Sequence, residues 1–167
     1  TAAEPNWLID RPTTPPYGHL MFVLVLAVPL VIALFLGALG VHAPGAADAA
    51  PSSVLMIHWI LLLSCGAVSL LSGTMHTLLR KTTAENIGWA TSPFQLELGY
   101  LTYGLGVASI VASFLGQDAW IVITIITTFF MFGTAALHIQ EMIKEHNFAP
   151  GNTLVLFASI PQPVVLW

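Results

Sequence analysis

Residues 119–139 read AWIVITIITTFFMFGTAALHI, a run that contains no Asp, Glu, Lys or Arg. A helix needs about 20 mainly apolar residues to cross the hydrocarbon core of a bilayer. This stretch is long enough for one crossing, and we expect its helix to cover residues 119–141. It therefore predicts an integral membrane protein.

Other apolar runs extend this prediction to a bundle. Three are long enough to cross a bilayer: residues 18–41, which contain Pro29, residues 54–79 and residues 93–115. A fifth apolar stretch, residues 153–167, is too short to cross as a straight helix, and we interpret it as a partial fifth span. The fold class is therefore an all-α polytopic helix bundle that forms a single domain over residues 1–167.

The composition supports a lipid environment and excludes one class of partner. Of 167 residues, 56% are hydrophobic and only 7% are charged, whereas soluble domains carry about 25% charged residues. The net charge is −4, and no basic block is present. We therefore expect the lipid bilayer as the main partner and exclude nucleic acid.

The basic residues predict an orientation. With four spans, all of them fall on one side of the membrane: Arg11, Arg80, Lys81 and Lys144. Cytoplasmic loops carry the excess of Lys and Arg. We therefore expect the N-terminal arm, residues 1–17, to be cytoplasmic, together with the loops after the second and fourth spans.

Ionisable residues near the ends of the spans form the candidate site. The topology brings His76, Glu97 and His138 to one layer near the cytoplasmic interface. Glu141 lies one turn beyond His138, and Arg80 is a nearby counter-charge. Charged or titratable groups at membrane depth are expensive and usually functional.

The start of the third span is marked by a capping pattern. Ser92 fits the N-cap, Pro93 the first helical position, and Gln95 the capping-box partner. Glu97 then lies in the second turn, where the helix dipole favours a carboxylate.

The helical faces lead us to expect that the site points into the bundle. The second span carries Cys65, Ser69, Ser72, Gly73 and His76 on one face, and the fourth carries Thr124, Thr127, Met131, Thr134 and His138. The third span places Glu97, Tyr100 and Gly104 on one face, which we expect to face inward as well.

Three kinds of chemistry suit this set. As a metal site, His76, Glu97, His138 and Glu141 offer donors for a divalent transition metal. As a cofactor or small-ligand site, His76, Glu97, His138 and Arg80 offer hydrogen bonds, for example to a quinone headgroup. A His/Glu pair also suits proton transfer. Against these stands a plain alternative, in which the histidines are solvated by headgroups and Glu97 pairs with Arg80.

Two stretches resemble a known family. They are 86–89 with 92–99, which read NIGW and SPFQLELG, and 138–141 with 147–152, which read HIQE and NFAPGN. They are similar to the signatures of a bacterial and archaeal membrane family known only as domain of unknown function 6790. The resemblance implies a small protein of four or five spans in a bacterial or archaeal inner membrane, with emphasis on His76, Glu97, His138 and Asn152. It implies no activity, and this chain has Ser159 where an acidic residue is expected.

The function therefore stays open between three classes at this level. The first is a membrane protein whose His/Glu cluster binds a metal, cofactor or small ligand, with catalysis undecided. The second is a non-catalytic accessory subunit or homo-oligomer that packs through small-residue faces. The third is a proton or solute pathway, for which the chain lacks an internal repeat.

Overall fold

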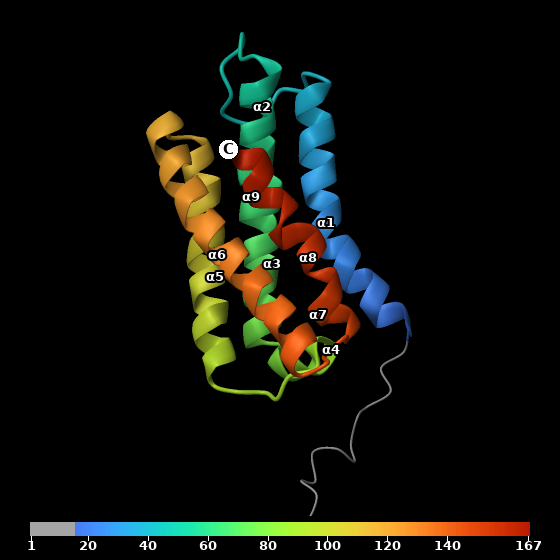
Figure 1. The fold of residues 1–167 in the computed structure, drawn as a ribbon. Helices are drawn as coiled ribbons and strands as arrows, with labels where there is room; N and C mark the ends of the chain where they lie inside the picture. The colour runs from blue at the N-terminus through green and yellow to red at the C-terminus, as the bar shows by residue number, and fades with distance from the viewer. Residues whose placement is uncertain (1–15) are drawn as a thin grey trace, which may run out of the picture.

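The computed structural model describes residues 16–167, with side chains described from Val25 onward. The predicted arm at residues 1–17 and the basic Arg11 therefore fall almost wholly outside the described part. All regular structure in this part is helical: α1 (Pro16–Ala38), α2 (Ser52–Trp59), η2 (Ile60–Ala67), α3 (Val68–Thr77), α4 (Arg80–Ile87), α5 (Phe94–Ser113), α6 (Gln117–Lys144), α7 (Pro150–Leu154), α8 (Leu156–Ser159) and α9 (Pro161–Leu166). The long helices stand side by side in an upright bundle (Figure 1).

Three helices are long and apolar enough to cross a membrane. They are Ser52–Thr77, formed by α2, η2 and α3 in one continuous rod, then α5 and α6. Their bounds agree with the predicted spans to within one turn. In α1, the apolar part with described side chains, Val25–Ala38, is shorter than a full crossing.

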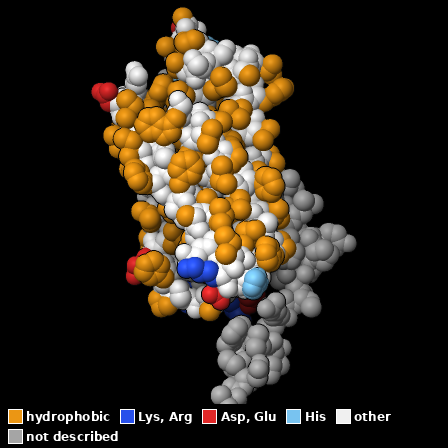
Figure 2. Space-filling model, viewed as in Figure 1, with side chains coloured by type: hydrophobic (Ala, Val, Ile, Leu, Met, Phe, Trp, Pro, Cys, Tyr) orange, Lys and Arg blue, Asp and Glu red, His pale blue; other side chains and the backbone are white. Residues whose placement is uncertain are grey.

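The surface of the bundle has an apolar band between two polar ends. Figure 2 shows hydrophobic side chains covering the body of the visible face, with charged side chains gathered at its ends. Large apolar residues are widely exposed on this bundle, including Phe129 at 79% and Val122 at 55%. Monomeric soluble proteins rarely expose apolar patches of this extent.

Glycines let α3 and α5 pack closely. A Cβ on Gly73 would lie 2.7 Å from the ring of Tyr103, and one on Gly99 would lie 3.2 Å from the carbonyl oxygen of Gly73. Further along α5, a Cβ on Gly106 would meet the carbonyl oxygen of Gly66, in η2, at 2.9 Å. Such small residues allow helix backbones to approach in lipid, where the hydrophobic effect does not drive association.

The connection after the second span differs from the prediction. We expected a polar loop over residues 80–92, but this segment contains α4, which ends at Gly88 in the left-handed region with φ +80°. The sequence did not predict this helix because it is short and polar and lacks the long apolar run that identified the spans. Its buried Thr83 hydroxyl donates to the carbonyl of Met75 at 2.9 Å, which folds α4 back under α3.

The capping pattern at the start of α5 is present in part. The N–H of Ser92 donates to Oε1 of Gln95 at 3.3 Å, as a capping box requires, and α5 begins at Phe94. The Ser92 side chain makes no cap bond at this end. Gln95 instead uses its Nε2 to donate to the carbonyl of Arg80 at 3.2 Å, which ties α5 to α4.

The C-terminal apolar segment, predicted as a partial fifth span, consists of three short helices, α7, α8 and α9. In Figure 1, α7, α8 and α9 follow one another along the bundle from the end that contains α4, and each contacts α6. Pro161 starts α9, because proline has no N–H to continue the preceding helix. Gln162 is 1% exposed and anchors this segment in the bundle. It accepts a hydrogen bond from Ser64 at 3.0 Å and donates to Sγ of Cys65 at 3.1 Å.

Candidate functional site

A cavity of about 450 Å³ lies between two walls of the bundle. One wall is made by α3 and α5, and the other by α6 with α7, α8 and α9. Most lining side chains are apolar, such as Leu98, Phe130, Met131 and Leu137. The volume falls in the range of about 300–1,000 Å³ that is usual for small-molecule sites.

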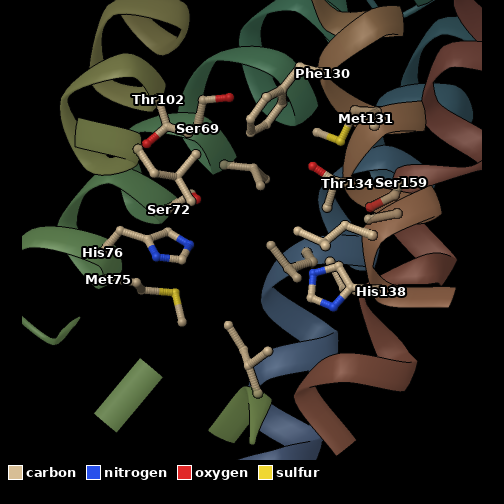
Figure 3. Close-up of a pocket in the computed structure, with 18 of the residues that line it drawn as sticks. Ser69, Ser72, Met75, His76, Thr102, Phe130, Met131, Thr134, His138 and Ser159 are labelled. Atoms are coloured by element: carbon tan, nitrogen blue, oxygen red, sulfur yellow. The ribbon is translucent and has the colours of Figure 1, made fainter. Parts of the chain in front are cut away.

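Two histidines face this cavity from opposite walls. Figure 3 shows His76 of α3 on one side and His138 of α6 on the other. His76 Nδ1 is buried and has no hydrogen-bond partner in the described part of the chain. His138 is 5% exposed. His76 and His138 therefore line one cavity from two different helices.

Asn152 holds the ring of His138. Its Oδ1 lies 2.5 Å from His138 Nδ1, and it is itself fully buried. Its Nδ2 donates to the carbonyl of His138 at 3.2 Å and to the carbonyl of Asn147 at 2.8 Å. The side chain of Asn152 is thus bonded through both its oxygen and its nitrogen, which fixes the orientation of the imidazole.

Trp89 stacks on one face of the His138 ring. The two aromatic planes are stacked, with centroids 5.1 Å apart and an angle of 7°. The indole N–H donates to Oε2 of Glu141 at 3.2 Å, which holds Trp89 in place. Glu141 therefore orients the wall of the cavity through Trp89 and does not line it.

The stretches that resemble the family signatures meet at this point. Gly88 has φ +80°, and a Cβ there would lie 2.6 Å from Oδ1 of Asn147. Asn147 Nδ2 donates to the carbonyl of Ile87 at 2.9 Å. A Cβ on Gly151 would lie 2.5 Å from the carbonyl oxygen of Asn86. The glycines therefore allow α4 and α7 to touch, and this contact positions Trp89 and Asn152 around His138.

A second polar atom without a partner among the described residues lies on the same cavity wall as His138. Ser159 is 1% exposed and lines the cavity, and its hydroxyl has no hydrogen-bond partner among the described residues. The sequence singled out Ser159 only as a departure from the family pattern. Other hydroxyls of the lining come from Ser69, Ser72, Thr102 and Thr134 (Figure 3).

The prediction that Glu97 faces inward was wrong. Glu97 is exposed and does not line the cavity, and Tyr100 on the same face is 70% exposed. The inner face of α5 carries small residues instead, because these permit the close contact with α3: Gly99, Thr102, Gly106 and Ser109. Arg80 is also exposed and does not line the cavity.

The structure does not support the predicted metal site. Within the described residues, no three His, Cys, Asp or Glu side chains are arranged to hold a metal ion. The reason is geometric: His76 and His138 lie on opposite walls, Glu97 points outward, and Glu141 accepts from Trp89. The remaining arrangement is two imidazoles and a free hydroxyl in an apolar chamber, which suits binding through hydrogen bonds.

Comparison with known protein families gives a match over most of the chain. A family model described as a family of unknown function, DUF6790, matches residues 19–167. No curated protein and no solved structure matches the chain.

Proposed function

The chain belongs to the DUF6790 family, and we propose that it is a membrane protein that binds a small, largely apolar ligand between His76 and His138. The ligand occupies the 450 Å³ cavity, where its polar groups pair with His76 on one wall and with His138 and Ser159 on the other.

One observation carries this proposal. The cavity walls bury two polar atoms, His76 Nδ1 and Ser159 Oγ, that have no partner among the described residues. A buried polar group without a hydrogen bond costs about 1–3 kcal/mol. A ligand that supplies the missing partners recovers this energy, while its apolar body fills the rest of the chamber.

The shape of the lining supports a ligand of mixed character. Apolar residues such as Leu98, Phe130 and Met131 surround a few polar groups. Small-molecule sites are mainly apolar pockets in which a few polar groups fix the orientation of the ligand. A strongly charged solute would find no compensating charge on this lining, which consists of apolar, hydroxyl, amide and imidazole groups.

We place the protein in a bilayer with α1 as a fourth crossing and with the polar end that contains α4 in the cytoplasm. The apolar band between polar ends supports the membrane location (Figure 2). The described basic residues, Arg80, Lys81 and Lys144, belong to α4 and the last turn of α6, which end the bundle on the same side in Figure 1. The positive-inside rule then supports a cytoplasmic location for that end.

A paired glycine substitution tests the ligand site. Gly133 of α6 lines the cavity, and a Cβ there would have open space around it. Gly104 of α5 has the same open space but does not line the cavity. We expect Gly133→Leu to fill part of the chamber, whereas Gly104→Leu serves as the matched control.

The probe is a decane chain that bears a diazirine, applied to the protein in lipid nanodiscs. Mass spectrometry then locates the photolabel on residues of the lining, such as Met75 and Met131. We expect this label to fall by about tenfold in Gly133→Leu and to persist in Gly104→Leu. Label that is confined to lipid-facing residues, or equal on the lining in both variants, contradicts the proposal.

A further inference from the structure

The amide of Asn152 decides which nitrogen of His138 carries a proton. Its Nδ2 donates to two carbonyl oxygens, those of His138 and Asn147. The reverse placement would set Oδ1 against both carbonyls, which are acceptors only. Oδ1 therefore faces His138 Nδ1, and the short contact of 2.5 Å requires Nδ1 to be the donor.

This assignment leaves Nε2 as the ring nitrogen that serves the ligand. In a neutral imidazole that is protonated at Nδ1, Nε2 carries only a lone pair and accepts a hydrogen bond. His138 makes no Nε2 bond within the described part of the chain, and its ring borders the cavity. A ligand that pairs with Nε2 must bring a donor, so a carbonyl or an ether does not suffice.

The neighbouring hydroxyl adds a second requirement. Ser159 lies on the same wall as His138 in Figure 3, and its free hydroxyl is able to donate as well as accept. A ligand hydroxyl donates its hydrogen to His138 Nε2 and accepts from Ser159 through its oxygen. One hydroxyl group thus pairs with both polar residues of this wall.

From this the geometry points to a lipophilic alcohol or phenol as the ligand class of the cavity, an inference that rests on the proposed function. Its hydroxyl is bound by His138 Nε2, and Asn152 acts as the positioning residue that keeps Nε2 an acceptor. The apolar body of the ligand lies among Leu98, Phe130 and Met131.

Two matched probes test the ligand class. 4-Hexylphenol has a hydroxyl donor, whereas 4-hexylanisole has the same body with a methyl ether that only accepts. Each competes with the diazirine label in nanodiscs at equal concentration within the membrane. We expect the phenol to compete at about fivefold lower concentration, the equivalent of one hydrogen bond.

The His138→Phe variant is the matched control for this preference. Phenylalanine retains an aromatic ring for the stack on Trp89 and removes both nitrogens. We expect the phenol to lose its advantage in this variant while the anisole competes as before. If the label reaches the cavity but both probes compete equally in the wild type, the ligand class is wrong and the proposed function stands. If the label never reaches the cavity, the proposed function itself fails.

A measurement on the unsubstituted protein keeps the test decisive if His138→Phe does not fold. Nitrogen-15 NMR of histidine-labelled protein distinguishes the protonated from the unprotonated ring nitrogen. We expect one histidine with a protonated Nδ1 and an unprotonated Nε2, whose Nε2 signal shifts with 4-hexylphenol and not with 4-hexylanisole. A His138 protonated at Nε2, or at both nitrogens, overturns the inference.

Discussion

The indole of Trp89 and the imidazole of His138 lie stacked at 5.1 Å, with their planes 7° apart. These residues come from the link after α4 and from the last third of α6, so the stack joins two distant parts of the chain. Trp89 also lines the cavity. A molecule in the cavity that contacts His138 therefore also lies close to the indole of Trp89.

We predict that Trp89 reports ligand binding by its fluorescence. Titration with 4-hexylphenol changes the tryptophan emission of the wild type, because the probe alters the polarity next to the indole. Trp89→Phe abolishes most of this change, whereas Trp120→Phe retains it, since Trp120 does not line this cavity. A response that survives in Trp89→Phe and disappears in Trp120→Phe places the probe elsewhere.

The packing of η2 and α3 on α5 gives a prediction about stability. Gly106→Ala introduces a methyl group 2.9 Å from the carbonyl oxygen of Gly66 and against Leu70, so we expect a loss of about 1–3 kcal/mol. Gly104→Ala, two residues away on the exposed face, meets nothing within 4 Å and leaves stability unchanged or slightly higher. The measurement is the apparent Tm in detergent, with all variants heated at one scan rate. Equal Tm values for the two variants contradict this packing.

The proposed orientation is testable with single cysteines. In a Cys65→Ser background, Asp48→Cys and Lys81→Cys place thiols on exposed positions at the two ends of the bundle. We expect a membrane-impermeant maleimide to label Asp48→Cys in intact cells, and Lys81→Cys only after permeabilisation. The reverse pattern places α4 outside the cytoplasm.

The helices were predictable because their apolar runs are long and carry almost no charge. The alternating directions of successive helices also predicted that His76 and His138 lie near the same end of the bundle, and both line one cavity there. The sequence did not predict in the same way which face of each helix points into the bundle. Glu97 fell on the outer face of α5, since the close contact at Gly99 and Gly106 determines which side of that helix faces α3.

The partners of His138 depend on contacts between distant segments. Asn152 was indicated by the family resemblance, but its hydrogen bond to Nδ1 requires α7 to lie against α6. Trp89 reaches the ring only because α4 folds back beneath α3, and α4 was predicted as a loop. No local pattern of apolar residues encodes such contacts between short segments.

Gln162 is a further residue that the sequence did not single out, and it leads to the last prediction. It bonds to Ser64 and Cys65 in the middle of η2, so it ties the C-terminal segment to the centre of the bundle. Cys65 is the only cysteine of the chain and is 1% exposed. Removal of these bonds by Gln162→Ala frees α9 to open and costs about 1–3 kcal/mol locally.

We therefore expect N-ethylmaleimide to modify Cys65 about tenfold faster in Gln162→Ala than in the wild type. Gln140→Ala, which changes an exposed glutamine of α6, serves as the control and leaves the rate unchanged. The apparent Tm of each variant separates local opening from global unfolding, because only local opening raises the rate well below that temperature. An unchanged rate in Gln162→Ala means that packing of Pro163 and Leu166, both buried, holds α9 without the amide.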